Sequence, residues 1–204
     1  RNTFLSKMVR RGVIILKISA CVITKNEEFN IIKWLNCMKK IADEMILVDT
    51  GSNDNTVNIA KKYGAITYEI NWENDFSVAK NFAIDKATGE WIVFLDADEY
   101  FTNESIDHVR KYIFEADSKK MDAIICKIVN INEDENCKVI SSFYNLRIFK
   151  NHSSLRYKNK VHEKKKKNGE LKLLQVVNDV EIYHTGYSTG KRKKKLERNL
   201  KILL

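Results

Sequence analysis

Short runs of apolar, often β-branched residues alternate with helical stretches through the first half of this chain. Four such runs occur, at Ile18–Thr24, Glu44–Asp49, Ala65–Ile70 and Trp91–Leu95. Between them lie segments with helical spacing or helix-capping residues, at 27–40, 53–63 and 76–87, the last stopped by Gly89. Strands that are continuously apolar and separated by helices are typical of a parallel sheet covered on both faces. The sequence therefore predicts an α/β fold.

The pattern changes in the second half of the chain. After a helix expected at 104–116, two longer runs, Asp122–Ile131 and Val139–Phe149, flank the polar segment NEDENCK and predict an antiparallel hairpin. A last strand is expected over Val176–His184. The segment Lys191–Leu204 begins a basic helix and ends before completing it.

This pattern divides the chain into three expected parts. Residues 1–16 form an N-terminal extension, residues 17–190 form one α/β domain, and residues 191–204 begin a C-terminal helical region. A chain of 204 residues suits one domain of ordinary size.

The positive charge is concentrated at the C-terminal end. The chain carries a net charge of +9, and residues 156–204 hold 15 Lys or Arg against 5 Asp or Glu. Such a tail is compatible with nucleic acid, an anionic membrane surface, a phosphate-bearing ligand or a solvated face. The basic runs are Lys164–Lys167 and Lys191–Lys195, and composition alone does not choose among these partners.

The cysteines favour a reducing compartment. Cys21 and Cys126 lie in apolar runs expected to be buried strands, and no CxxC spacing occurs among the four cysteines. Reduced thiols of a cytoplasmic protein fit this pattern better than disulfides or a zinc site. The run GVIILKISAC after Arg10 and Arg11 is similar to a secretory signal, but Lys17 interrupts it.

The most specific chemical feature is the acidic segment Asp96-Ala97-Asp98, followed by Glu99, at the end of the fourth apolar run. Ligands of open α/β sheets bind at the carboxyl ends of the strands. Two carboxylates one residue apart, a DxD pattern, can bind a hard divalent cation and leave other coordination positions open. Three neighbouring acids repel one another unless a cation compensates them. The alternative is a solvated acidic loop that caps a helix.

Two other apolar runs also end in polar residues. The first ends in Thr24-Lys25-Asn26-Glu27, and the second ends in Asp49-Thr50-Gly51-Ser52-Asn53-Asp54. In a parallel sheet these ends meet at one edge, so three acidic clusters are expected to converge there.

Four segments in this order, ISACVITKNEE, LVDTGSNDNT, FSVAKNFAI and WIVFLDADEYF, closely resemble glycosyltransferase family two, which has the GT-A fold. The resemblance covers residues 17–190. The later segments LRIFKN, NKVHE and IYHTGY resemble a bacterial subgroup in which a tetratricopeptide or other helical region often follows.

The resemblance implies a nucleotide-sugar site at the expected edge of the sheet. Thr24, Glu27 and Asp49 would line the nucleotide pocket, with Asp49 on the uracil or ribose. Asp54 matches a second acid of that loop, or else caps the next helix. Lys80 stands where the family often has Arg, so it would keep the positive charge but lose the bidentate geometry.

The resemblance also implies the metal site and the base. Asp96 and Ala97 would contact the donor, with Asp96 and Asp98 as metal ligands and Asp98 as the main one. His184 would be a further metal ligand, or else a structural histidine at the end of a strand. Glu163 would be the catalytic base, or else an ion-pair partner of Lys160 or Lys164, and His162 would lie on the acceptor side.

The resemblance thus implies an inverting hexosyltransferase that uses Mn²⁺ or Mg²⁺ and a nucleotide-diphospho-sugar, with UDP-sugar favoured. The acceptor is left open among glycan, lipid-linked, protein and peptide substrates. A cytoplasmic location is expected, with peripheral contact at the inner membrane face left open through the basic tail.

Three rival classes fit less well. A DxD phosphatase carries its motif at the end of the first strand, whereas here it ends the fourth. A P-loop enzyme lacks its GxxxxGK[ST] motif in this sequence. A nucleic-acid-binding module should interleave aromatic residues with its basic patch, but only Tyr157, Tyr183 and Tyr187 lie there, so no nucleic-acid partner is expected.

Overall fold

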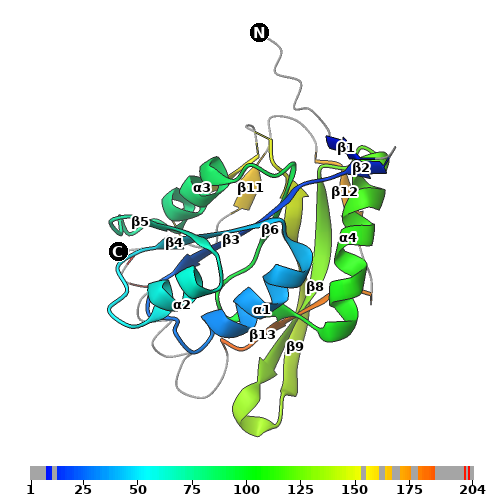
Figure 1. The fold of residues 1–204 in the computed structure, drawn as a ribbon. Helices are drawn as coiled ribbons and strands as arrows, with labels where there is room; N and C mark the ends of the chain where they lie inside the picture. The colour runs from blue at the N-terminus through cyan, green and yellow to red at the C-terminus, as the bar shows by residue number, and fades with distance from the viewer. Residues whose placement is uncertain are drawn as a thin grey trace.

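The computed structural model describes most of the chain. The described residues are 8–10, 13–152, 155–160, 164–166, 171–175, 179–186, 200 and 202. Four α-helices are present among them: α1 (Ile31–Ile41), α2 (Thr56–Lys62), α3 (Phe76–Lys86) and α4 (Asn103–Ser118). Figure 1 shows these helices arranged around one large curved sheet.

The large sheet has nine strands within the described residues, in the order β5-β4-β3-β6-β9-β8-β13-β7, with β12 paired to β8. Their bounds are β3 (Ile18–Thr24), β4 (Glu44–Asp49), β5 (Ile66–Glu69), β6 (Trp91–Phe94), β7 (Glu99–Phe101), β8 (Ala123–Asn132), β9 (Lys138–Lys150), β12 (Leu173–Gln175) and β13 (Glu181–His184). The strands β5, β4, β3 and β6 are parallel to one another. The predicted α/β fold with a parallel sheet is therefore confirmed for the first half of the chain.

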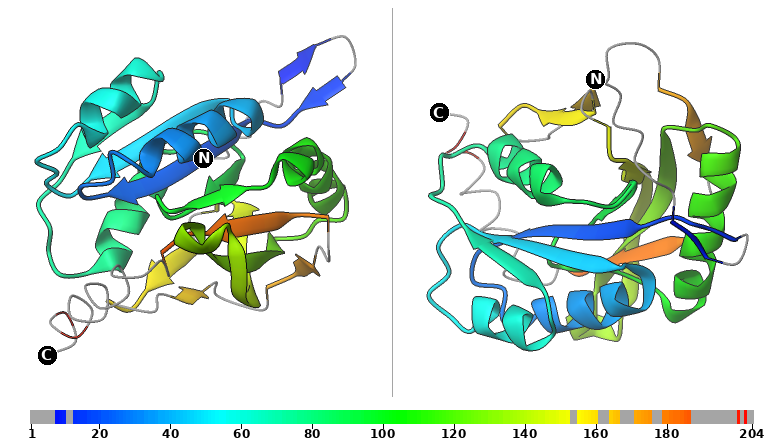
Figure 2. Two further views of the ribbon diagram at one scale, coloured as in Figure 1. Left: turned by 90° about the horizontal axis from the view of Figure 1, so that it is seen from below. Right: turned by 45° about the horizontal axis from the view of Figure 1, so that its top comes forward.

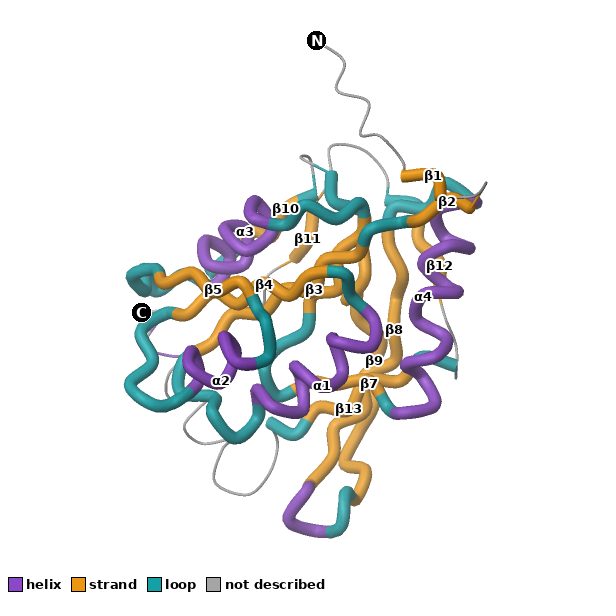
Figure 3. Tube along the Cα trace, viewed as in Figure 1, coloured by secondary structure: helices purple, strands orange, loops and turns teal. Residues whose placement is uncertain are grey.

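The second half of the sheet is mixed. Strand β9 pairs antiparallel with β6 and with β8, as the predicted hairpin requires. The 3₁₀ helix Glu133–Glu135 joins β8 to β9. The hairpin formed by these two strands projects from the sheet in Figures 1 and 3. The last strand β13 runs parallel to β8 and antiparallel to β7. The strand β7 was not predicted, because three residues directly after an acidic turn are too few to show periodicity.

Helices cover both faces of the parallel half of the sheet. Successive residues of its strands point to opposite faces, and the apolar ones on each face pack against a helix. On β4, Met45 and Leu47 pack in the core on the side of α1, whereas Ile46 and Val48 pack in the core on the side of α3. Figure 2 shows α3 on the face opposite to α1 and α2.

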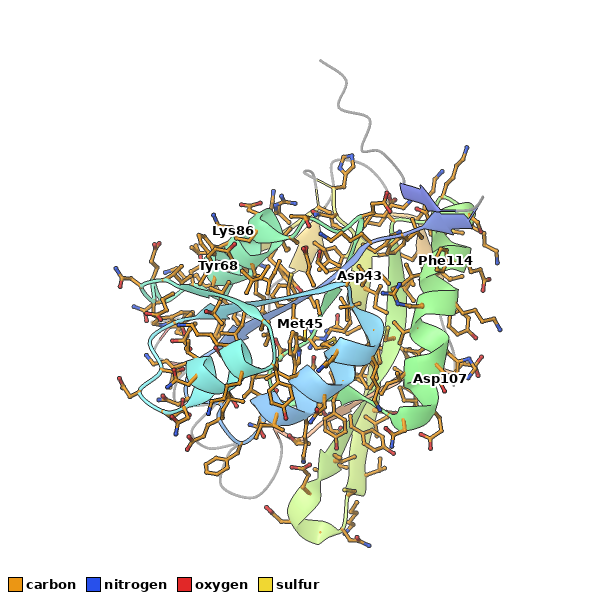
Figure 4. All side chains as sticks on the ribbon, viewed as in Figure 1. Asp43, Met45, Tyr68, Lys86, Asp107 and Phe114 are labelled. Atoms are coloured by element: carbon orange, nitrogen blue, oxygen red, sulfur yellow. The ribbon has the colours of Figure 1, made fainter. Side chains whose placement is uncertain are left out.

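Labelled side chains show this packing at the edges of the sheet. Met45 lies between the sheet and α1 in Figure 4. At the end of α3, the Lys86 Nζ atom lies 5.3 Å from the centroid of the Tyr68 ring on β5 (Figure 4). The apolar runs of the sequence therefore serve two cores, one on each face.

Helix α1 begins four residues later than the predicted start at residue 27. The Glu27 carbonyl oxygen accepts hydrogen bonds from the Asn30 and Ile31 backbone N–H groups, at 3.0 and 2.8 Å. Residues 27–30 therefore form a turn that leads into the helix, and this turn carries part of the predicted site.

Gly89 was predicted only as the stop of a helix, and the structure gives a different reason for it. Helix α3 has already ended at Lys86. A Cβ atom at Gly89 would lie 2.5 Å from Ser19 Oγ and 2.7 Å from the Ser19 backbone nitrogen. The glycine is required because the chain passes directly against strand β3.

Two small antiparallel pairs lie outside the large sheet. Strands β1 (Met8–Arg10) and β2 (Val13–Ile15) pair within the predicted N-terminal extension, and Leu16 directly after them is buried. Strands β10 (Arg156–Lys158) and β11 (Lys164–Lys166) form the second pair.

Several predictions fall partly outside the described residues. Of the strand predicted over 176–184, residues 181–184 form β13, and 176–178 lie outside the described part. Only residues 200 and 202 of the predicted C-terminal helix are described, and both are helical. Among the described helices, none has the length and apolar character needed to cross a membrane.

All four cysteines are described and unbonded to one another, and Cys21 and Cys126 are buried as predicted. Burial raises the pKa of the Cys37 thiol to about 11, which keeps it protonated at neutral pH.

Candidate active site

The candidate site lies at the carboxyl ends of strands β3, β4 and β6. Strand β3 is parallel to both neighbours, with Thr24 opposite Asp49 on β4 and Cys21 opposite Phe94 on β6. The polar segments after these strands therefore leave the sheet at the same edge, as predicted.

Asp49 is the centre of the first polar cluster at this edge. Its Oδ1 atom accepts hydrogen bonds from Thr24 Oγ1 at 3.0 Å and Ser52 Oγ at 2.5 Å. Its Oδ2 atom accepts from the Gly51 and Ser52 backbone N–H groups, at 2.9 and 2.7 Å. Gly51 has a φ of +99°, a conformation that favours glycine. The structure thus brings Thr24 and Asp49 together, and Asp49, which is 2% exposed, shapes the loop that follows β4.

Glu27 and Asp54 tie the first two loops to each other. The Glu27 backbone N–H donates to Thr56 Oγ1 at 2.8 Å, and the Glu27 side chain accepts from Asn30. Asp54 accepts from the Thr56 backbone N–H at 3.0 Å and from the Glu28 backbone N–H at 3.1 Å. Slight burial alone would raise the pKa of Asp54, but these hydrogen bonds lower it. The contact with the Thr56 N–H is that of a residue that caps the start of α2, which was the alternative to a role of Asp54 in nucleotide binding.

Asp96, directly after Leu95 at the end of β6, lies between two cationic side chains. Its Oδ1 atom is 3.3 Å from Lys80 Nζ, and its Oδ2 atom is 3.0 Å from Arg147 Nη2. Burial alone would raise the pKa of Asp96, but the positive charges of Lys80 and Arg147 hold it well below its usual range. Asp96 is therefore a compensated carboxylate, and its side chain is 35% exposed.

Lys80 reaches Asp96 from the buried side of helix α3. The residue is 4% exposed, and its ammonium group lies 5.7 Å from the Phe94 ring centroid and 5.1 Å from that of Tyr157. A compact ammonium group can contact one carboxylate and two aromatic rings in this way. The structure thus places the positive charge of Lys80 next to the Asp96 carboxylate.

Arg147 is a site residue that the sequence analysis missed. The register of the β8–β9 hairpin shifts between Ile124, opposite Ile148, and Ile125, opposite Leu146, so Arg147 occupies a β-bulge. Bulges change the direction of a side chain and are frequent beside active sites. Arg147 Nη2 donates to both Asp96 and Glu99, and its side chain is only 9% exposed.

Glu99 completes the buried charge cluster. It is 1% exposed, and its Oε2 atom accepts from the Asp96 backbone N–H at 3.0 Å. Burial raises the pKa of Glu99, with a further contribution from the negative charge of Asp96, and Arg147 opposes this shift. Burial by itself lowers the pKa of Arg147, but the Glu99 and Asp96 carboxylates raise it overall, so the guanidinium stays charged.

The predicted pair Asp98 and His184 does come together. His184 Nε2 is 3.4 Å from Asp98 Oδ2, and the two side chains are 14% and 10% exposed. Thr185, the residue after His184, also holds Asp98 in place, because its backbone N–H donates to the Asp98 carbonyl oxygen at 3.0 Å. Ala97, between the two aspartates, is 7% exposed.

The arrangement changes the argument for a metal ion. The acids were expected to be uncompensated, but Asp96 and Glu99 are paired with Lys80 and Arg147. Among the described residues, no three His, Cys, Asp or Glu side chains converge on one point as a preformed metal centre. The two predicted metal ligands that the structure does bring together are Asp98 and His184, whose facing atoms lie 3.4 Å apart.

Glu163 and His162 lie outside the described residues, as do Lys167 and the basic run 191–195, so the structure gives them no contacts. Strand β11 begins directly after Glu163, and its partner β10 is fastened to α3. There, the Tyr157 backbone N–H donates to Asn81 Oδ1 at 2.9 Å, and Asn81 Nδ2 donates to the Tyr157 carbonyl at 3.0 Å.

Comparisons with known proteins agree with this architecture. The sequence model of one family, described as glycosyl transferase family 2, matches residues 19–193. The glycosyltransferase SunS of the SPβ prophage in Bacillus subtilis is 30% identical over 190 residues, which cover 91% of this chain and 44% of SunS. A TPR repeat-containing protein of Synechococcus elongatus is 31% identical over 152 residues, covering 74% of this chain and 36% of that protein. The chain thus spans less than half the length of these curated relatives.

Solved structures give the same fold. The 1–349 fragment of Staphylococcus aureus TarS matches with a TM-score of 0.62 and 16% identity, covering 92% of this chain and 71% of that one. A second structure of that fragment, in complex with UDP, also gives a TM-score of 0.62, with 19% identity, over 93% of this chain and 66% of that one.

Proposed function

The chain belongs to glycosyl transferase family 2, and on this basis we propose that it transfers a sugar from a nucleotide-diphospho-sugar to an acceptor. The donor would lie along the edge formed by the ends of β3, β4 and β6. The observation that carries this proposal is the pairing of Asp98 with His184 beside Asp96, at the place where open α/β sheets bind ligands.

The residues at this edge of the sheet suit the nucleoside and the diphosphate of a nucleotide-sugar donor. Thr24, Glu27 and Asp49 lie in the loops after β3 and β4 and would face the nucleoside. Asp96 and Ala97 lie between these loops and Asp98, and would meet the ribose and the diphosphate. UDP is the first nucleotide to test, because a TarS fragment of the same fold has been solved with it.

We propose that Asp98 and His184, with Asp96, hold Mn²⁺ or Mg²⁺ when the donor binds. The bound cation would supply positive charge to the diphosphate leaving group. The Asp98 carboxylate and the His184 imidazole lie 3.4 Å apart, close enough for both to bind one cation. The chain's own contribution is to keep these groups at fixed positions before the donor arrives.

Glu163 is the proposed catalytic base, and His162 the proposed acceptor-side residue. A carboxylate at Glu163 would take the proton from the attacking hydroxyl or thiol of the acceptor. With one base and no covalent intermediate, the anomeric configuration inverts. The acceptor is a glycan, a lipid-linked glycan, a protein or a peptide.

We further propose that the protein acts in the cytoplasm, where the basic runs 164–167 and 191–195 attract the anionic donor or an anionic membrane face. The proposal includes no nucleic-acid partner. A helical region, of the tetratricopeptide or another type, would begin at residue 191.

The test is thermal unfolding in the presence of a panel of nucleoside diphosphates, with and without Mn²⁺. A ligand at about 100 times its dissociation constant stabilises the folded state by about 2.7 kcal/mol. We expect a Mn²⁺-dependent increase in the melting temperature with UDP, and loss of this increase in Asp98→Ala.

A matched control changes Asp54, an acid of the same loop system whose hydrogen bonds go to the Thr56 and Glu28 backbone N–H groups. Asp54→Asn keeps a capping side chain and should keep the nucleotide response. No response of the folded wild-type protein to any nucleotide would contradict the proposed donor site. RNA binding that falls steeply with salt and survives Asp98→Ala would favour a nucleic-acid-binding module instead.

A further inference from the structure

One buried asparagine on the hairpin contacts the proposed metal-binding histidine. Asn130 on β8 is 3% exposed, and its Oδ1 atom lies 2.8 Å from His184 Nδ1. Its amide nitrogen donates to Ser141 Oγ on β9 at 2.8 Å. The amide is therefore held at both ends.

The sheet register explains why these groups meet. Four neighbouring strands place Ser141, Asn130, His184 and Glu99 directly opposite one another, in a single row across β9, β8, β13 and β7. Directly paired residues share one face of the sheet, so their side chains lie side by side. The row runs from the exposed hairpin to the buried charge cluster.

The chemistry of the amide decides the tautomer of the imidazole. A carbonyl oxygen only accepts hydrogen bonds, so with Asn130 Oδ1 as its partner His184 Nδ1 carries the proton and donates it. The neutral imidazole then has its lone pair on Nε2. That atom is the one that lies 3.4 Å from Asp98 Oδ2. In this tautomer a divalent cation bound between the two atoms would have both of them as ligands.

We propose that Asn130 is a positioning residue that holds His184 in the Nδ1–H tautomer, so that the Nε2 lone pair faces the Asp98 carboxylate. The role of Asn130 in metal binding rests on the proposed function. Its effect on the His184 tautomer does not depend on that function. Groups that fix a ligating histidine in this way commonly change metal affinity by about 10- to 100-fold when removed. Ser141 supports the arrangement, because its hydroxyl accepts a hydrogen bond from the amide nitrogen of Asn130.

The first experiment reads the tautomer directly. Long-range ¹H–¹⁵N NMR spectra at pH 8 distinguish a protonated from an unprotonated ring nitrogen, and the chain has only four histidines. His184→Gln identifies the signals of His184. We expect the wild type to show Nδ1–H, and Asn130→Leu, which removes the acceptor with a side chain of similar size, to lose that preference. Asn130→Asp keeps an acceptor oxygen and should keep the tautomer.

The second experiment measures Mn²⁺ binding without donor or acceptor, by electron paramagnetic resonance of the free ion. Asn130→Leu should weaken binding by about 10- to 100-fold, while Asn130→Asp retains it. Asn132→Leu is the matched control, because it removes another buried asparagine of β8 that bonds to Asp134 and Glu135 instead. Circular dichroism confirms that each variant is folded.

An Nε2–H tautomer in the wild type would overturn the proposal. So would an Asn130→Leu variant that folds and keeps both the Nδ1–H tautomer and the wild-type Mn²⁺ affinity. If the tautomer follows residue 130 but the wild type binds no Mn²⁺, the positioning role stands and the proposed metal site fails.

Discussion

Replacing Arg147 by Met tests whether the buried charge cluster is held together as the structure shows. The change keeps an unbranched apolar stem and removes the guanidinium. It leaves Glu99, which is 1% exposed, without its ion pair to Arg147, and leaves the ion pair between Asp96 and Lys80 in place.

The magnitude follows from the two bonds that are lost. Breaking a buried ion pair by removing one partner costs about 3–5 kcal/mol, because the remaining charge is buried without compensation. This range is an upper limit for Glu99, because burial raises the pKa of its carboxyl group and a proton can take the place of Arg147 as its partner. The bond to Asp96 adds less than about 1 kcal/mol, because that side chain is 35% exposed and retains Lys80 at 3.3 Å. We therefore expect the free energy of unfolding to fall by up to about 3–5 kcal/mol at pH 7.

The assay is urea unfolding in EDTA, followed by circular dichroism. Arg147→Met/Glu99→Gln removes the uncompensated charge as well and should recover at least about 2 kcal/mol of the loss. Arg110→Met is the control, since its Nη2 atom pairs at 2.8 Å with Asp43, labelled in Figure 4, and both side chains are about one-third exposed. That change should cost less than about 1 kcal/mol. The reasoning is refuted if Arg147→Met costs no more than Arg110→Met, or if the double variant is no more stable than the single one.

Two further predictions concern stability away from the site. Gly89→Ala should lower the free energy of unfolding by about 1–3 kcal/mol or more, because the new Cβ would meet the Ser19 backbone at 2.7 Å. Gly64→Ala, with φ of +85° but open space around it, should cost about 1–2 kcal/mol, and urea unfolding that ranks Gly64→Ala as clearly the worse change would contradict the packing argument. Burial alone would raise the pKa of Glu44, but hydrogen bonds from Ser19, Lys17 and Thr88 lower it to about 2. Its stabilisation is therefore present above the usual glutamate pKa of about 4.3 and is lost as the pH falls toward 2. Glu44→Gln should cost about 1–2 kcal/mol at pH 7, after allowance for solvent screening, and the difference should shrink below pH 4; a constant difference from pH 7 to pH 3 would exclude this carboxylate as its source.

The sequence predicted the parallel half of the sheet because burial there leaves a local mark. Strands apolar on both faces, such as Ile18–Thr24 and Glu44–Asp49, were predicted with the bounds that the structure gives them. The position of Asp49 and Asp96 at one edge followed from the same pattern, since parallel strands end together. The proximity of Asp98 and His184 followed from the family resemblance, not from spacing.

Arg147 and Asn130 could not be found in this way. Arg147 reaches Asp96 and Glu99 through a bulge in the pairing of β8 with β9, and a bulge depends on the register of two strands. Asn130 meets His184 because β13 pairs with β8 at that residue, 54 positions apart in the chain. Their only signal in the sequence is a polar residue between two apolar neighbours, at Asn130 in VNI and at Arg147 in LRI. The roles of Glu163 and His162 stay predictions, because both lie outside the described residues.

The central claim is that a divalent cation links Asp98 to the diphosphate of a nucleotide donor. Isothermal titration of UDP, with and without Mn²⁺, on the wild type and Asp98→Asn tests it most directly. By linkage, Mn²⁺ must strengthen UDP binding by the same factor by which UDP strengthens Mn²⁺ binding. We predict a factor of at least about tenfold, or about 1.4 kcal/mol, in the wild type, and less than about twofold in Asp98→Asn. Equal affinity for UDP with and without Mn²⁺, or full coupling in Asp98→Asn, would contradict the account.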